Sequence, residues 1–260
     1  MHFSFVRFAL VGTISANSKR ETINAKVKGM NAIEHPFESI DRIAPPVDGE
    51  LHVWRFPLVA RPLHCLSESE RERARRYAVE RPRQQFIAAR GILRELLAAY
   101  LNCEPADVPL GVEPDGKPVL ANARLHFNVT HSGERGLIAV ANRRVGVDLE
   151  AVRPMPNAAG LVERFFGPEE REQFSALPDD LKLAGFFRGW TCKEALLKAV
   201  GTGIQNVNKC VVDLDPRRPT KIIRFDHVAE RGSWRLAAWE PEAGYAAALA
   251  IEAEAAIEWL

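Results

Sequence analysis

Gly146-Val147-Asp148-Leu149-Glu150 is one of two stretches that decide the fold, and the other is Trp190-Thr191-Cys192-Lys193-Glu194-Ala195-Leu196-Leu197-Lys198. In a strand alternate residues point the same way, so Asp148 and Glu150 are expected on one face. In a helix residues four apart share a face, so Glu194 and Lys198 are expected together. Carboxylates that converge from a strand and a helix can hold a hard divalent cation. The two stretches therefore indicate an enzyme of metal-dependent phosphoryl transfer.

Each stretch also has an ordinary structural interpretation when taken alone. An Asp-x-Glu pair is often a solvated strand edge, and Glu194 with Lys198 would be a surface ion pair that contributes only about 0.2–0.5 kcal/mol. Trp190 is expected to anchor its helix in the core, and we assign Cys192 no catalytic role.

Composition limits the class of protein. The chain has 260 residues, enough for one large domain or two small ones, and its net charge of +1 argues against nucleic acid as a partner. No apolar run reaches the roughly 18 residues of a membrane helix, so we expect no membrane partner. The four cysteines are widely spaced and form no CxxC pair, which disfavours a zinc site or a disulfide framework. These features are typical of a cytoplasmic protein.

Hydrophobic periodicity and breakers predict two halves of similar order. Alternation predicts strands, and apolar stripes with a capping box at Ser67 and Glu70 predict helices. The expected strands are 51–56, 125–129, 137–141, 145–150, 210–214, 221–225, 234–239 and 245–251, and the expected helices are 68–79, one opened by Pro82, 162–166, 168–177 and 179–200. The order is strand, helices and strands, then helices and strands, so each half has helices followed by a β-rich segment. This order predicts an α+β fold with related halves at 46–143 and 144–260. Residues 1–45 are expected to form a loosely packed extension.

Two further segments place polar groups at turns. Residues 126–133 put hydroxyls and an imidazole at a strand end, where they can donate to phosphate oxygens, although an ordinary polar turn is the alternative. Residues 114–118 form a predicted turn that contains Lys117, for which a solvated lysine is the default. The arginines of residues 68–79 alternate with glutamates, which is typical of a solvated helix.

Four motifs together resemble the 4′-phosphopantetheinyl transferases, in particular the larger single-chain group called the surfactin-synthetase-activating type. The resemblance spans about residues 68–203, and beyond 203 it rests on strand pattern alone. The motifs are Gly116-Lys117-Pro118, Phe127-Asn128-Val129-Thr130-His131-Ser132-Gly133, and the two stretches quoted first. The resemblance implies two similar halves related by a pseudo-twofold axis, with coenzyme A bound in the cleft between them.

The resemblance also implies the reaction. The 4′-phosphopantetheine arm of coenzyme A would pass to a serine of an apo acyl or peptidyl carrier protein, releasing adenosine 3′,5′-bisphosphate. The protein would act as a monomer, because both halves of the cleft lie in one chain. Two other classes stay open: a non-catalytic module that binds coenzyme A or a carrier, and a metal-dependent hydrolase of nucleotide pyrophosphates.

Site residues follow from the same resemblance, position by position. Asp148, Glu150 and Glu194 match the acids that bind Mg²⁺, and Glu194 is also the expected base. Lys198 matches the lysine near the pyrophosphate. The positions that match coenzyme A contacts are Arg73 for the 3′-phosphate, Lys117, Thr130, His131 and, on a weaker match, Arg90.

Overall fold

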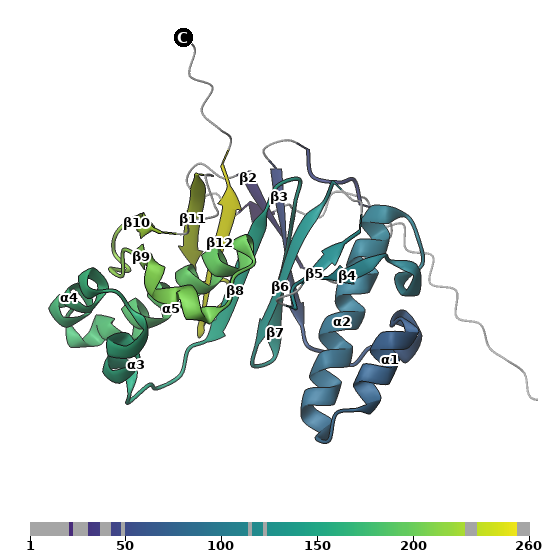
Figure 1. Cartoon of the computed structure of the whole chain (residues 1–260), viewed down its shortest axis with the longest axis horizontal. Coiled ribbons are helices and arrows are strands. Elements are labelled where there is room, and N and C mark those ends of the chain that lie inside the picture. The colour runs from purple at the N-terminus through teal and green to yellow at the C-terminus, as the bar shows by residue number, and fades with distance from the viewer. Residues whose placement is uncertain are drawn as a thin grey trace, which may run out of the picture.

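The computed structural model describes residues 21–22, 31–36, 43–47, 50–113, 116–121, 124–226 and 233–253 (Figure 1). Its helices are α1 (Glu68–Arg75), α2 (Glu80–Leu101), α3 (Ala158–Phe165), α4 (Pro168–Ala176) and α5 (Asp179–Val200). Its strands are β1 (Glu21–Thr22), β2 (Asn31–Pro36), β3 (Glu50–Pro57), β4 (Leu110–Val112), β5 (Pro118–Leu120), β6 (His126–Ser132), β7 (Arg135–Ala141), β8 (Val145–Ala151), β9 (Cys210–Val212), β10 (Ile222–Phe225), β11 (Trp234–Trp239) and β12 (Tyr245–Glu252).

The two halves repeat one topology, which confirms the predicted α+β fold. In the first half β7 lies between β3 and β6, and in the second half β12 lies between β8 and β11, all antiparallel. Each half starts with a strand, continues through helices and a short hairpin, and returns with a hairpin that pairs back onto the first strand. The short hairpins are β4–β5 and β9–β10. The halves lie side by side (Figure 1). Their matching strand orders make them pseudo-twofold equivalents.

The predicted start of α1 and the predicted end of α5 agree with the structure, because a capping box and a glycine determine them. Ser67 and Glu70 form the reciprocal capping box that begins α1. Helix α5 spans the predicted residues and ends at Gly201, whose φ of 80° lies in the left-handed region that favours glycine. Strands β4 and β5 were not expected, because three residues each are too short for a period to be recognised. Pro114 and Asp115 of the predicted turn lie outside the described residues.

Two short strands fall inside residues 1–45, where the sequence indicated only a loose extension. Strand β2 pairs in parallel with β3, with Asn31 opposite Glu50, and β1 pairs antiparallel with β2. The first half therefore carries a five-stranded sheet in the order β1-β2-β3-β7-β6. Backbone hydrogen bonds to the open edge of β3 define β2, and its side-chain pattern carried no strand signal. The other residues between 1 and 42 lie outside the described part of the chain.

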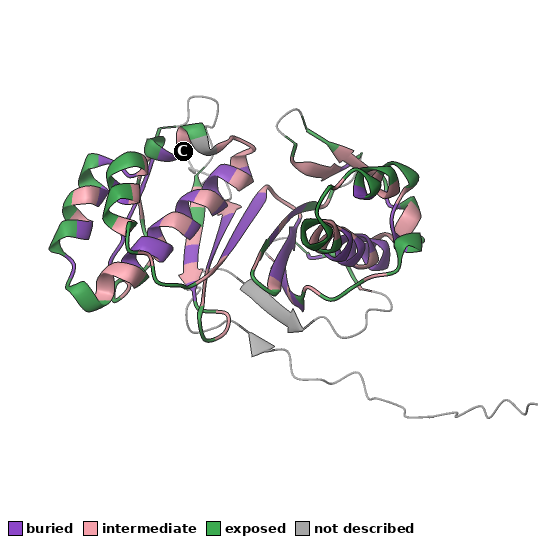
Figure 2. Cartoon of the chain, turned by 90° about the horizontal axis from the view of Figure 1, so that it is seen from below, coloured by how far each residue is buried: buried purple, intermediate pink, exposed green. Residues whose placement is uncertain are grey.

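Each long helix packs on the sheet of its own half. The core of the first half joins Ile92 and Leu96 of α2 to Trp54 and Phe56 of β3. In the second half α5 is largely buried, while α3 and α4 expose most of their outer surface (Figure 2). Trp190 packs in this core with its ring 5.8 Å from that of Phe165, as expected for an anchor. Among the described residues no helix is both long and apolar enough to cross a membrane.

Helix α5 lies directly against the backbone of β8 at Gly146. A Cβ built on Gly146 would lie 2.1 Å from the carbonyl oxygen of Ala195 and 2.4 Å from the amide nitrogen of Ala199. Only glycine fits at this contact, because no real Cβ approaches backbone atoms so closely. Two alanines on the facing side of α5 permit the same approach. The contact determines how far the side chains of α5 stand from those of β8.

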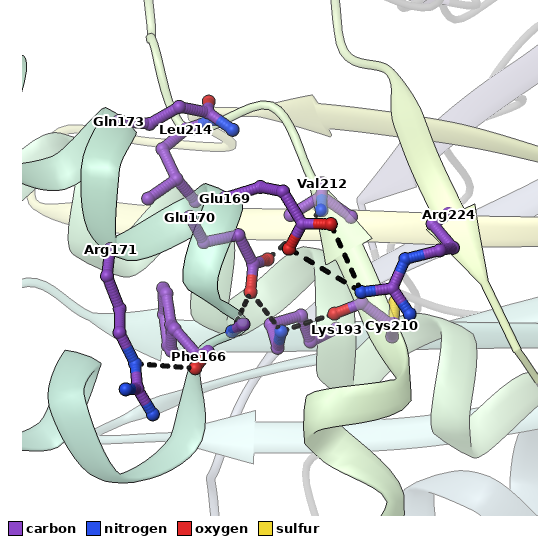
Figure 3. Close-up of polar contacts among 11 residues, drawn as sticks. Phe166, Glu169, Glu170, Arg171, Gln173, Lys193, Cys210, Val212, Leu214 and Arg224 are labelled. Carbon is purple, nitrogen blue, oxygen red and sulfur yellow. Dashed lines mark hydrogen bonds and ion pairs between the residues drawn. The ribbon is translucent and has the colours of Figure 1, made fainter.

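A fully buried ion pair holds the opposite side of α5 (Figure 3). Lys193 Nζ lies 2.5 Å from Glu170 Oε2, and both side chains are 0% exposed. Glu170 also accepts from the backbone nitrogens of Gly167 at 2.8 Å and Val212 at 3.0 Å, and Lys193 donates to the carbonyl oxygen of Cys210. One carboxylate thus connects α4, α5 and β9. These hydrogen bonds satisfy both charges in a region without solvent.

Replacing Lys193 with methionine should lower the free energy of unfolding by about 3–5 kcal/mol, because the Glu170 carboxylate would stay buried without its cation. The double variant Lys193→Met/Glu170→Gln should recover part of the loss, since neutral glutamine still accepts from the backbone. Urea unfolding of each variant measures both changes. The control is Lys182→Met, whose partner Asp179 is 94% exposed and whose loss should be within about 0.5 kcal/mol. Equal stability of Lys193→Met and Lys182→Met would contradict the account.

Candidate functional site

The candidate site lies where the two halves meet, between β6 and β8 (Figure 1). These strands belong to different sheets, and polar side chains of β6 bridge them. Asn128 Oδ1 accepts from the backbone nitrogen of Val147 at 2.9 Å, and Ser132 Oγ accepts from that of Ala151 at 3.0 Å. Because Asn128, Thr130 and Ser132 alternate along β6, they share the face toward β8. These hydrogen bonds between β6 and β8 therefore hold β8, the strand that carries Asp148 and Glu150.

Asp148 is the most enclosed acid of the site, with 4% of its surface exposed. Its Oδ1 accepts from Lys198 Nζ at 2.5 Å and from Thr130 Oγ1 at 3.2 Å, whereas its buried Oδ2 has no hydrogen-bond partner among the described residues. Burial raises the pKa of Asp148, although Lys198 and Thr130 act in the opposite direction. Lys198 thus pairs across the helix–strand interface with Asp148, and not along the helix with Glu194.

Glu150 and Glu194 complete the acidic group. Glu150 is half-buried and accepts from Ser132 Oγ at 2.9 Å. Burial and the nearby charge of Asp148 raise its pKa. Glu194 is half-buried on α5, and burial raises its pKa as well, with further contributions from Asp148 and Glu150. The charge of Asp148 affects the pKa of both glutamates, and the charge of Lys198 affects the pKa of all three acids. The three predicted carboxylates therefore lie close to one another, with Lys198 beside them.

A pocket of about 390 Å³ lies on the other side of β6, against α1 and α2. Its lining combines basic and aromatic side chains with apolar ones: Arg73, Tyr77, Pro82, Gln85, Phe86, Ala89, Arg90, Leu93, Val129 and His131. The Arg73 guanidinium lies over the Phe86 ring at 5.0 Å, and the Arg90 guanidinium lies 5.9 Å from the same ring. Burial lowers the pKa of His131, and the charge of Lys198 lowers it further.

The basic residues around the pocket differ in their partners. On α1, Arg71 and Arg75 pair with Glu68, as a solvated helix would have them, whereas Arg73 has no acidic partner among the described residues. Arg90 Nε lies 3.5 Å from Glu70 Oε1, which holds the guanidinium at the pocket wall. Arg73 is therefore the residue of α1 whose charge is available to an anion in the pocket.

Lys117 lies apart from the pocket, at the C-terminal end of α5. Its Nζ donates to the carbonyl oxygen of Lys198 at 2.6 Å and to that of Ala199 at 3.4 Å. A cation is favourable at this end of a helix, where the last carbonyls lack intrahelical partners. The structure thus places Lys117 beside the backbone of Lys198, across the junction between the halves.

The carboxylates suit a hard cation in their chemistry. Asp148 has a buried oxygen without a hydrogen-bond partner among the described residues, and burial raises the pKa of all three acids. The charge of Asp148 raises the pKa of Glu150 and Glu194 further, and a bound cation would offset both effects. Within the described part of the chain, no group of three or more His, Cys, Asp or Glu side chains is arranged so that it could hold a metal ion. An incomplete set of this kind fits Mg²⁺, which commonly binds one or two carboxylates and fills its other positions with water and substrate phosphates.

Sequence reasoning did not assign roles to several residues that the structure places at the site. Asn128 and Ser132 bond to β8, and counting alternate positions from Thr130 would have placed both on its face. Phe86 lies on α2, and its ring packs against the guanidinium groups of Arg73 and Arg90. No local pattern marks an aromatic residue as part of a pocket wall.

Comparison with known proteins places the chain in a family. Two family models match, "4′-phosphopantetheinyl transferase superfamily" over residues 144–250 and "4′-phosphopantetheinyl transferase, N-terminal" over residues 58–143. The 4′-phosphopantetheinyl transferase HetI of Nostoc sp. is 39% identical over 213 residues, 78% of this chain and 87% of that protein. A 4′-phosphopantetheinyl transferase of Bacillus subtilis is 29% identical over 145 residues, 55% of this chain and 64% of that protein.

A solved holo-(acyl-carrier-protein) synthase from Bacillus anthracis, in complex with CoA (3′,5′-ADP), covers 42% of this chain and 96% of its own, with 22% identity and a TM-score of 0.36. The family models together span well over half of the chain, and the Nostoc relative spans more than two thirds of it. The resemblance drawn from four sequence motifs is thereby confirmed. The chain belongs to the 4′-phosphopantetheinyl transferase superfamily and is a 4′-phosphopantetheinyl transferase.

Proposed function

We propose that this transferase moves the 4′-phosphopantetheine arm of coenzyme A to a serine of an apo acyl or peptidyl carrier protein and releases adenosine 3′,5′-bisphosphate. One observation carries the proposal. Neighbouring residues of β6 face two compartments: His131 lines the basic pocket, and Thr130 bonds to Asp148 in the acidic group. A single strand thus separates a nucleotide-sized pocket from a cluster suited to a pyrophosphate and its cation.

The pocket would receive the adenosine end of coenzyme A. Arg73 supplies a guanidinium that has no acidic partner among the described residues, and Arg90 supplies a second guanidinium from α2. Guanidinium groups donate in a planar fork that matches phosphate oxygens, so both suit the 3′-phosphate. Aromatic rings of Tyr77 and Phe86 offer apolar surface to a purine. His131 would contact the phosphates as they pass from the pocket toward β8.

The acidic group would hold Mg²⁺ through Asp148, Glu150 and Glu194. When bound, Mg²⁺ would neutralise charge on the pyrophosphate and orient it for displacement. Thr130 and Lys198 lie at the same place and can donate to phosphate oxygens. Lys117 adds positive charge from its position at the end of α5.

The chain's own groups would move the proton and stabilise the leaving group. The carrier serine oxygen forms a bond to the β-phosphorus, the bond from that phosphorus to the bridging oxygen breaks, and adenosine 3′,5′-bisphosphate departs with the electron pair. Glu194 accepts the serine proton, directly or through a water. The Lys198 ammonium stabilises charge on the leaving phosphate.

The same proposal covers the assembly and compartment. Pocket and acids both come from one chain, so a monomer would contain a complete site. Cys65, Cys192 and Cys210 are buried free thiols, and burial raises the pKa of each, which suits a protein of the reducing cytoplasm.

Transfer is tested by incubating the protein with coenzyme A, Mg²⁺ and apo carriers of fatty-acid, polyketide and peptide synthesis, then weighing the carriers by mass spectrometry. We expect one phosphopantetheine arm per carrier and none after EDTA treatment. Glu194→Gln should lower kcat by roughly 10²–10⁴-fold, because the base is lost. Glu172→Gln, at an exposed position of α4, serves as the control and should transfer normally.

Two outcomes would contradict this function. Release of free phosphopantetheine without a carrier would indicate hydrolysis, and tight coenzyme A binding with no modified carrier would indicate a binding module.

Arg73→Ala should weaken binding of coenzyme A by about 10-fold or more, equivalent to roughly 1.4 kcal/mol or more. The loss follows from a missing charge-assisted hydrogen bond to the 3′-phosphate. Titration calorimetry with coenzyme A and with 3′-dephospho-coenzyme A separates the cause: wild-type protein should prefer coenzyme A, and the variant should lose that preference. Arg75→Ala, which removes an exposed partner of Glu68, is the matched control. An undiminished preference in Arg73→Ala would remove Arg73 from the site.

A further inference from the structure

Ser132 has two hydrogen bonds that determine the direction of its hydroxyl proton. It is the last residue of β6, and its Oγ accepts from the backbone nitrogen of Ala151 at 3.0 Å. The same oxygen lies 2.9 Å from Glu150 Oε2. A hydroxyl has a single proton, and a carboxylate only accepts, so the proton of Ser132 points at Glu150. Ser132 is thus tied to the backbone of β8 and donates to an acid on that strand.

Glu150 has fewer hydrogen bonds to hold its side chain than Asp148 has, among the described residues. Glu150 and Asp148 lie two apart on one face of β8, so their charges repel each other. Asp148 is buried and held by Lys198 and Thr130, whereas Glu150 is half-exposed, so repulsion from Asp148 would turn its side chain toward solvent. The hydroxyl of Ser132 opposes that movement. It is the hydrogen-bond donor to the Glu150 side chain in the described part of the chain.

The strand end that carries Ser132 is itself fixed to the second half. The turn after it contains Gly133, with a φ of 59°, against the hydroxyl of Tyr245 on β12. Arg135, which follows the turn, places its Nε 2.7 Å from Glu242 Oε1. The turn that follows Ser132 is therefore held against the second half, so Ser132 cannot easily follow Glu150 if that side chain moves.

We propose that Ser132 is a positioning residue that holds the Glu150 carboxylate inside the acidic group, beside Asp148. The inference rests on the proposed function, because it assumes that Glu150 serves the cation and the pyrophosphate. Ser132 acts through Glu150 and needs no contact of its own with substrate. It differs in this from Thr130, whose hydroxyl reaches both Asp148 and Lys198.

The test compares Ser132→Ala with Ser132→Thr, which keeps the hydroxyl. The control is Ser175→Ala, which removes an exposed hydroxyl that donates to the carbonyl oxygen of Arg171 within α4. The first readout is binding of Mn²⁺ alone, followed by electron paramagnetic resonance. Because loss of a residue that orients a metal ligand typically costs 10–100-fold in affinity, we expect the Kd for Mn²⁺ to rise by roughly 10-fold in Ser132→Ala. Ser132→Thr should stay close to wild type.

Kinetics give the second readout. Ser132→Ala should lower kcat and raise the Mg²⁺ concentration at half-maximal rate, while the KM for coenzyme A should change little, because the basic pocket is untouched. A double-mutant cycle with Glu150→Ala isolates the contact: in that background Ser132→Ala should have no additional effect on Mn²⁺ binding. Thermal unfolding of all variants shows whether each one is folded.

The outcomes separate the inference from the proposed function. Unchanged Mn²⁺ affinity in Ser132→Ala, or an equal loss in Ser132→Thr, would overturn the positioning role while transfer by wild-type protein still supports the function. If wild-type protein modifies no carrier but Ser132→Ala weakens Mn²⁺ binding, the function fails and the positioning role stands. Absence of Mn²⁺ binding by wild-type protein would overturn the inference outright.

Discussion

Contact between the backbones of β8 and α5 at Gly146 is the constraint on which the rest of the site depends. A Cβ at this position would lie 2.1 Å from the carbonyl oxygen of Ala195, so any other residue would push the helix away from the strand. At the observed separation Lys198 reaches Asp148 across the interface at 2.5 Å. Because the two backbones touch, Asp148 and Glu150 of the strand lie near Glu194 of the helix.

A buried ion pair holds the other side of α5. Lys193 is fully buried against Glu170, whereas Lys198, five residues later, is half-exposed at the site. The first lysine stabilises the packing of α4, α5 and β9, and the second provides charge for chemistry. Helical geometry separates their roles, because residues five apart on a helix point to different sides. Between them, Glu194 is carried on a helix that is anchored on both faces.

Local chemistry was enough to predict most elements, and long-range partners were not predictable. Period-two alternation and the glycine after Val200 set β8 and α5 closely, and the paired acids with Glu194 were recognisable from spacing and family resemblance. No pattern indicated that Glu170 pairs with Lys193, because these residues lie on different helices and meet only in the folded second half. Strand β2 is likewise defined by backbone pairing with β1 and β3. The strands of the hairpin β4–β5 have three residues each, too few for a side-chain period to be recognised.

The central claim is that one molecule of coenzyme A bridges the basic pocket and the acidic group across β6. A crystal structure of the protein with coenzyme A and Mg²⁺ tests it most directly. The account predicts the adenosine 3′-phosphate beside Arg73 in the pocket, and the pyrophosphate between Asp148 and Lys198. Coenzyme A bound outside this pocket, or a pyrophosphate remote from Asp148, would contradict it.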